Sequence, residues 1–141
     1  MVDVSEKAVT RRIAEASCRV IMSTETVDAL SDLPKGDAIA VARLAGVQGA
    51  KRTAELVPLA HPLGLEQVEV ELAPGEGGVE IRSRVIVNAR TGAEMEALVA
   101  CSTAALALYD MVKAVERQTV ITDLRLEHKS GGRSGEYRRQ E

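Results

Sequence analysis

The chain has 141 residues and a net charge of −3 at neutral pH; 45% of its residues are hydrophobic and 28% are charged. This length suits one domain around a single core, which we expect to span residues 1–141. The negative charge and the absence of Phe and Trp argue against nucleic-acid binding, because bases would find almost no aromatic surface on which to stack.

The cysteines and the N-terminal residues indicate a cellular compartment. Cys18 and Cys101 are far apart in sequence and form no C-x-x-C pattern. They fit reduced, buried thiols better than a disulfide or a metal site. Residues 1–12 lack the apolar core of a secretory signal, and no apolar run approaches membrane-spanning length. We therefore expect a cytoplasmic protein that does not contact a membrane.

The first predicted elements are a strand and a short helix. Side chains alternate between apolar and polar over much of residues 16–23, which is typical of a strand. Thr24 is a candidate N-cap for a short helix that runs to Leu33 and is ended by Pro34 and Gly36.

The middle of the chain predicts a second helix and a hairpin. Asp37 is a plausible N-cap for a helix over residues 38–56, where small and apolar residues recur at helical spacing. Two prolines stiffen the following loop, residues 58–64. Alternation over 68–72 and 79–87 then predicts two strands joined by a hairpin turn.

The last part predicts a long helix over residues 94–113, a strand over 120–127 and a glycine-rich tail. The element order is therefore β-α-α-β-β-α-β. Without the short extra helix, this is the split βαβ pattern of a ferredoxin-like sandwich. We predict an α+β fold in which an antiparallel sheet carries helices on one face, together with an added helix.

Asp110 and Lys113 share one face of the long helix, because they are three positions apart. Exposed to water, such a pair is only a weak surface salt bridge. Apolar residues surround the pair between Leu106 and Val112, so we expect part of it to be poorly solvated. Partly buried charge needs an explanation, and a reactive site is one candidate.

Glu96 lies on the same helix but about 21 Å from Asp110, at 1.5 Å of rise per residue. The two side chains cannot contact one small reacting centre in a single chain. Either the ligand is long or a neighbouring chain completes the site. Small residues that recur between them point weakly to a symmetric oligomer, although packing on the chain's own sheet is the commoner explanation: Ala97, Ala100, Cys101, Ala104 and Ala107.

Three further segments carry reactive side chains. The segment 35–37 is typical of a turn and helix cap, but its lysine could also face an anion. His61 follows the basic pair at Lys51; a lone histidine is usually structural, yet two flanking prolines fix its backbone. No second His or Cys lies at ligand spacing, so we predict no zinc or other metal site. The segment 129–135 is either a flexible tail or a phosphate-binding loop, and it lacks the Walker A ending.

Seven short motifs follow one another in order along nearly the whole chain. They are KGD at Lys35, ARLAGVQGAKRT ending at Thr53, PLAHPL around His61, VEVEL at Val68, RTGAEMEAL from Arg90, YDMVKAV from Tyr109 and KSGGRSG from Lys129. By these motifs the chain resembles the cyclic pyranopterin monophosphate synthase family, also called molybdenum cofactor biosynthesis protein C.

The resemblance implies a ferredoxin-like fold with added helices and a defined reaction. Family members convert (8S)-3′,8-cyclo-7,8-dihydroguanosine 5′-triphosphate to cyclic pyranopterin monophosphate with loss of pyrophosphate. The resemblance also implies a homohexamer, a trimer of dimers with active sites at the dimer interface. Mg²⁺ could accompany the triphosphate, although the sequence has no dedicated carboxylate cage for it.

The resemblance also implies roles for individual residues. Asp110 matches the family's catalytic aspartate, Lys113 its lysine partner and Lys35 a second functional lysine. The other matches fall on substrate-contacting segments or at basic positions near the ligand: Leu59, Ala60, His61, Met95, Glu96, Lys51, Lys129 and Arg133.

Three residues depart from the family pattern. Ala60 stands where many members have Cys, so that thiol is not needed if this chain is active. Thr122 replaces a frequent Gly. Arg133 replaces a frequent Lys, which keeps the charge but changes its geometry.

The chemistry suits the matched residues. Opening and rebuilding the substrate ring requires proton transfers, and cations would stabilise the departing pyrophosphate. Our hypothesis makes Asp110 a base or proton shuttle that Lys113 keeps ionised, with Lys35 as the preferred general acid. A non-catalytic, oligomeric nucleotide-binding regulatory module would need the basic residues but not the Asp110–Lys113 pair, and a purely structural oligomerisation domain would bind no nucleotide.

Overall fold

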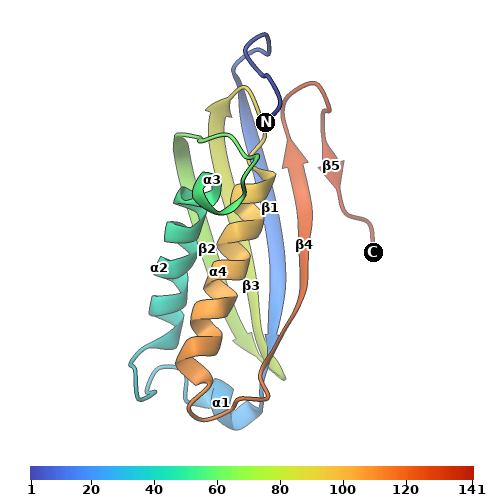
Figure 1. The fold of residues 1–141 in the computed structure, drawn as a ribbon. Coiled ribbons are helices and arrows are strands. Elements are labelled where there is room, and N and C mark those ends of the chain that lie inside the picture. The colour runs from blue at the N-terminus through green and yellow to red at the C-terminus, as the bar shows by residue number, and fades with distance from the viewer.

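The computed structural model describes residues 1–141 and has an α+β architecture, as predicted (Figure 1). Its elements in chain order are β1 (Thr10–Ile21), α1 (Thr24–Asp28), α2 (Ala38–Lys51), α3 (Thr53–Leu56), β2 (Leu65–Gly75), β3 (Gly78–Ala89), α4 (Glu94–Val112), β4 (Val120–Ser130) and β5 (Tyr137–Arg138).

The sheet confirms the ferredoxin-like prediction. Its strand order is β2-β3-β1-β4-β5, and every neighbouring pair is antiparallel. Strands β1 and β2 are therefore parallel to each other with β3 between them, which is the split βαβ arrangement. The helices α2 and α4 lie on one face of the sheet (Figure 1).

Glycines let α2 approach α4 closely. A Cβ atom on Gly49 would lie 2.4 Å from the Thr103 hydroxyl oxygen, and one on Gly46 would lie 3.0 Å from the Ala100 carbonyl oxygen. Ala97, Ala100, Cys101 and Ala104 are all buried in the core of the chain itself, and Ala107 packs against that core. The small-residue face of α4 is therefore used within the chain, and it does not support the weak inference of an oligomer drawn from it.

Three predicted boundaries in the N-terminal half were wrong. Strand β1 begins at Thr10, well before residue 16, because it is a central strand that pairs along its whole length with β3. Helix α1 is capped by Ser23, whose hydroxyl accepts from the Thr26 N–H at 3.3 Å, and not by Thr24. It also ends at Asp28, ahead of the predicted Leu33.

The predicted helix over residues 38–56 is divided in two at Arg52. The Thr53 hydroxyl donates to the Ala50 carbonyl at 3.0 Å and competes with the backbone for the last acceptors of α2. The N-cap prediction was right, since the Asp37 carboxylate accepts from the Ala40 N–H at 3.1 Å.

The C-terminal glycine-rich segment is a hairpin turn between β4 and β5. Gly131, Gly132 and Gly135 all have positive φ angles, which side chains rarely adopt. His128 and Glu136 join the two arms through a contact of 3.0 Å between Nε2 and Oε1.

Helix α4 forms the centre of the core. By length and composition alone it could cross a membrane, but half or more of it is buried between the sheet and α2, as in the core helix of a globular domain. The two cysteines are buried free thiols, as predicted, and the pKa of Cys18 is raised by its contact with Cys101 and by burial.

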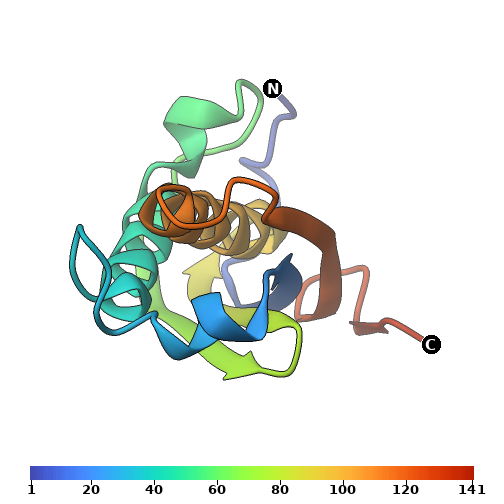
Figure 2. The same ribbon diagram turned by 90° about the horizontal axis from the view of Figure 1, so that it is seen from below.

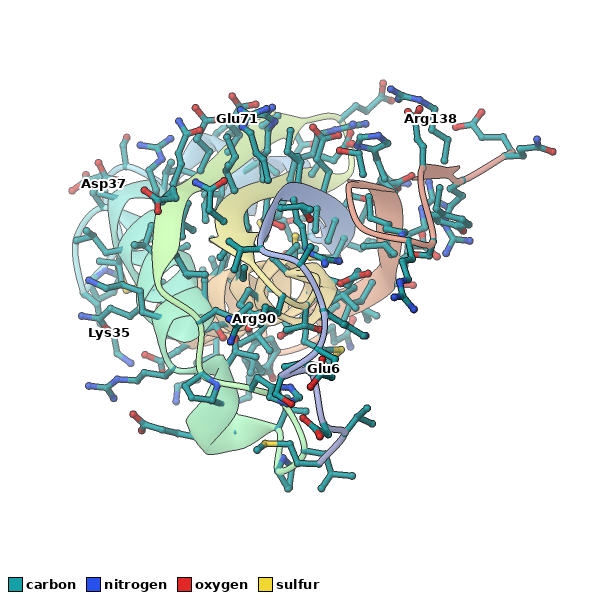
Figure 3. All side chains as sticks on the ribbon, turned by 90° about the horizontal axis from the view of Figure 1, so that it is seen from above. Glu6, Lys35, Asp37, Glu71, Arg90 and Arg138 are labelled. Carbon is teal, nitrogen blue, oxygen red and sulfur yellow. The ribbon has the colours of Figure 1, made fainter.

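The outer face of the sheet is covered with charged side chains. Glu15 pairs with Arg84 at 3.1 Å, and the Ser17 hydroxyl donates to Glu127 at 2.5 Å. Figure 3 shows acidic and basic side chains crowded along this face around Glu71. No helix covers this side, so chemistry that depends on the helices belongs to the other layer and to its two ends.

Candidate functional site

Asp110 lies between two lysines at the C-terminal end of α4. Lys35 Nζ is 2.8 Å from Asp110 Oδ2, and Lys113 Nζ is 2.9 Å from Asp110 Oδ1. Lys35 Nζ also lies 3.4 Å from the Asp110 carbonyl oxygen. The structure thus brings together the three residues predicted to be catalytic, one lysine on each carboxylate oxygen.

A tight turn presents Lys35 to this carboxylate. Leu33 and Gly36 exchange backbone hydrogen bonds of 2.9 and 3.3 Å, and Gly36 has a φ of 111° that favours glycine. Leu30 and Leu33 are buried, so the segment before the turn is anchored in the core. The predicted helix cap is confirmed at Asp37, and the lysine of the same segment faces the carboxylate of Asp110.

The two lysines set the protonation of Asp110. Hydrogen bonds from Lys35 first and Lys113 second lower the pKa of Asp110 to about 2. The prediction that this pair is poorly solvated was wrong, because all three side chains are about half exposed in the single chain. Leu108 and Met111 point into the core, whereas Leu106 is 62% exposed.

A second group of predicted residues lines a cavity of about 350 Å³ at the other end of α4. The lining includes five predicted binding residues together with N-terminal residues and the start of α4: Leu59, Ala60, His61, Met95, Glu96, Met1, Val2, Val4, Lys7, Leu63, Thr91, Gly92 and Glu94. His61 Nε2 donates to the Val2 carbonyl at 2.8 Å, which ties the proline-rich loop to the N-terminal segment.

Glu96 is a buried carboxyl group in this cavity. It is only 4% exposed, no ion pair reaches it, and burial raises its pKa. Figure 3, viewed from this end, shows Arg90 over the start of α4 and Glu6 on the N-terminal segment that crosses it. Glu96 and His61 line the same cavity, and a buried acid of this kind can hold a proton there.

Lys129 and Arg133 belong to a neighbouring basic region. Arg133 lines a cavity of about 480 Å³ with Lys7 and Arg12, and the Lys129 ammonium contacts the Ser134 hydroxyl at the same turn. Lys7 lines both this cavity and the one around His61. The two cavities thus share Lys7, and the second is lined by Lys7, Arg12 and Arg133 together with Glu6. Its excess of cationic side chains suits an anion.

Sequence reasoning missed Lys7 and Arg12. Both lie in the first residues of the chain, which carry no periodic apolar pattern. The adjacent basic residues at Arg11 and Arg12 were the available signal. They were not distinguishable from charged residues at the start of a strand.

Lys51 does not line the cavity around His61. It borders a separate groove at the end of α2, with Leu65 and Val68, and only Leu63 lines both. The helix length separates Asp110 from Glu96 within one chain, as the spacing predicted, because the two lie at opposite ends of α4.

No three His, Cys, Asp or Glu side chains gather where they could hold a metal ion.

A profile of the MoaC family matches residues 1–132. The chain is 57% identical to the cyclic pyranopterin monophosphate synthase of Streptomyces griseus over 141 residues, covering 99% of this chain and 80% of that protein. It is 56% identical to cyclic pyranopterin monophosphate synthase 3 of Mycobacterium tuberculosis, covering 100% and 81%. The relative of the same name from Streptomyces coelicolor is 52% identical, with 99% and 83% covered. This chain belongs to the MoaC family.

Proposed function

We propose that this protein is a cyclic pyranopterin monophosphate synthase, a lyase of molybdenum cofactor biosynthesis. It converts (8S)-3′,8-cyclo-7,8-dihydroguanosine 5′-triphosphate to cyclic pyranopterin monophosphate and releases pyrophosphate. The observation that carries the proposal is the Asp110 carboxylate held between Lys35 and Lys113 in a chain closely related to proteins of that name. A regulatory module would have no need for this arrangement.

The Asp110 carboxylate would act as a base or proton shuttle after a lysine leaves it, because the ion pairs weaken its basicity while they last. With its pKa lowered to about 2, Asp110 is ionised at any working pH. Lys113 lies on the same helical face and keeps it charged. Lys35 enters from a separate turn, so its ammonium can turn from the carboxylate to a substrate atom and donate a proton there.

The other end of α4 suits the binding of the substrate. His61, Glu96 and the exposed Leu59 would contact the ring system, and Ala60 and Met95 complete that wall. The basic residues beside them would hold the triphosphate: Lys7, Arg12, Lys129 and Arg133. Lys51 would act from its neighbouring groove. Mg²⁺ would then arrive with the triphosphate, held by phosphate oxygens.

We infer that two chains share each site. In the single chain Asp110 is half exposed and does not lie in an enclosed cavity. The cavity at the Glu96 end of the same helix is too far away to enclose it. Leu44 and Leu106 are 66% and 62% exposed on α2 and α4, as an uncovered helix surface would be. A two-fold dimer would bring the Asp110 end of one α4 to the Glu96 end of another. Three such dimers would form a cytoplasmic hexamer.

The direct test is incubation with the cyclised nucleotide. Pyrophosphate and a pyranopterin should appear in equal amounts, and light scattering should give a mass six times the 15.1 kDa of one chain. Asp110→Asn is the control, since it should bind the nucleotide without converting it. Tight binding without turnover by the wild type would instead indicate a regulatory module. The absence of both binding and turnover would indicate a structural domain.

A further inference from the structure

Glu116 makes a second connection between the two segments that carry Lys35 and Asp110. It follows α4, where its backbone N–H donates to the Val112 carbonyl at 2.9 Å. Its carboxylate accepts from the Ser23 N–H at 3.0 and 3.1 Å and from the Thr26 hydroxyl at 2.8 Å. The hydrogen bonds from Ser23 and Thr26 hold the pKa of Glu116 below its ordinary value. Figure 2 shows α1 beside the end of α4 and the loop that follows it.

The anchored residues lie at the start of the segment that ends in Lys35. Ser23 lies two residues after β1 and is the N-cap of α1, and Thr26 is buried in α1. After α1 the chain folds back, so that the Ala38 N–H donates to the Leu30 carbonyl at 2.9 Å. The turn that carries Lys35 is thus fixed between two anchors, the Glu116 carboxylate at one end and the start of α2 at the other.

The Lys35–Asp110 ion pair cannot fix this geometry by itself. Both side chains are about half exposed, and exposed pairs of this kind are weak and lose side-chain entropy when they form. The three hydrogen bonds to Glu116 join groups that are partly buried. They are consequently better suited to hold the backbone.

Capping of α1 does not account for Glu116. The Ser23 hydroxyl already accepts from the Thr26 N–H, as an N-cap does. Glu116 instead binds the N–H of Ser23 and a side-chain hydroxyl, and it reaches them from a different element. Its bonds therefore cross-link two segments.

We propose that Glu116 is a positioning residue, which clamps Ser23 and Thr26 to the end of α4 and so keeps the Lys35 turn within reach of Asp110. Its effect on turnover rests on the proposed function, whereas its effect on the distance between Lys35 and Asp110 does not.

The test compares Glu116→Ala, Glu116→Gln and Ser23→Ala, alone and combined with Lys35→Ala. Glu116→Ala should lower kcat by about 10- to 100-fold with little change in KM, because a catalytic group is displaced. Glu116→Gln keeps one acceptor oxygen and should recover much of the loss. Ser23→Ala removes the α1 cap and the hydroxyl that helps to lower the pKa of Glu116, but it keeps the backbone N–H that Glu116 binds, so it should lose much less activity than Glu116→Ala. In the Lys35→Ala variant, adding Glu116→Ala should cause no further loss of kcat.

A second measurement, the titration of Asp110, does not depend on enzymatic activity. Titration of the Asp110 carboxyl carbon by NMR should show its pKa rising from about 2 towards the ordinary value in Glu116→Ala, since Lys35 is the first cause of the lowering. An unchanged Asp110 titration, equal losses in Ser23→Ala and Glu116→Ala, or losses that multiply with Lys35→Ala would each overturn the proposal. If Glu116→Ala does not fold, Thr26→Val, which removes the hydroxyl that donates to Glu116, takes its place and should show the same changes at smaller size. If the wild type makes no product, the proposed function fails and the NMR titration still decides this inference.

Discussion

The two ends of α4 carry the same chemical group in opposite environments. Glu96 is buried in a cavity without a cationic partner, and burial raises its pKa. Asp110 is half exposed between two lysines, and its pKa is lowered to about 2. One helix thus holds a carboxyl group that tends to keep its proton and another that is always ionised.

The two carboxyl groups differ in pKa because different segments of the chain cover the two ends of α4. The proline-rich loop and the N-terminal segment close over Glu96, joined by the bond between His61 and the Val2 carbonyl. The short α1, the turn at Lys35 and the loop that follows α4 lie at the other end and leave Asp110 half exposed (Figure 2). Two titratable groups whose environments move their pKa values apart are suited to opposite roles, one as acid and one as base.

The variant expected to have the largest effect on activity is Asp110→Asn. Loss of an ionised base or proton shuttle should lower kcat by about 10²- to 10⁴-fold. Its exposed ion pairs contribute little to stability, so the melting temperature should hardly change. A variant that retained near-normal turnover while folded would contradict the role of Asp110. A variant that unfolded would contradict the solvent-exposed description of this end.

Mixing two inactive variants tests whether the ends of α4 serve different sites. If Asp110→Asn and Glu96→Ala are each inactive, chains that exchange partners at random form one intact site in each mixed dimer. Activity should then return to about a quarter of the wild-type value. If no activity returns after mass spectrometry has verified the exchange of chains, the two residues do not belong to one site shared between two chains.

Gly49→Ala tests the packing of α2 against the middle of α4, away from the charged residues at the two ends of that helix. The new Cβ would lie 2.4 Å from the Thr103 hydroxyl oxygen, which forces the two helices apart. Overpacking of this kind should lower the free energy of unfolding by about 1–3 kcal/mol. The measurement is urea unfolding, with Gly64→Ala as the matched control, because no atom lies within 4 Å of a Cβ placed there.

The smallest expected effect is the pH dependence of stability at Glu96. A carboxyl group with a raised pKa binds more protons when folded than when unfolded, so stability falls as pH rises from its unfolded pKa through its folded pKa. Glu96→Gln should remove this fall and leave the protein relatively more stable above that range. The pH dependence of stability has the opposite sign for Asp110, whose pKa is lowered on folding. Its contribution to stability is present above its unfolded pKa and is lost as pH falls towards about 2. Parallel pH curves for Glu96→Gln and the wild type would show that Glu96 is ionised as readily as an exposed residue.

The sequence was sufficient to predict what depends on local spacing. The order of the four long strands and of the helices α1, α2 and α4, the N-cap at Asp37 and the pairing of Asp110 with Lys113 follow from residues close together along the chain, whereas α3 and β5 were not predicted. The contact between Lys35 and Asp110 joins residues 75 positions apart; only the resemblance indicated that both are functional, and only the fold shows that they touch.

Other features depended on neighbours that local patterns do not include. Apolar residues around Asp110 suggested burial, but helical periodicity turns Leu108 and Met111 inwards and leaves Asp110 outside. Lys7 and Arg12 acquire meaning only because the N-terminal segment folds back beside the hairpin at Arg133. The bonds from Glu116 to Ser23 and Thr26 likewise depend on where β1 ends in space.

The position of the N-terminal segment has a practical consequence. Met1 and Val2 form part of the wall of the cavity that contains Glu96, and the Val2 carbonyl is held by His61. An affinity tag attached before Met1 would emerge beside that cavity and could enter it. The last residues follow β5 at one edge of the sheet, away from the N-terminus (Figure 1). A tag at the C-terminus is therefore the safer choice for every binding and kinetic measurement described above.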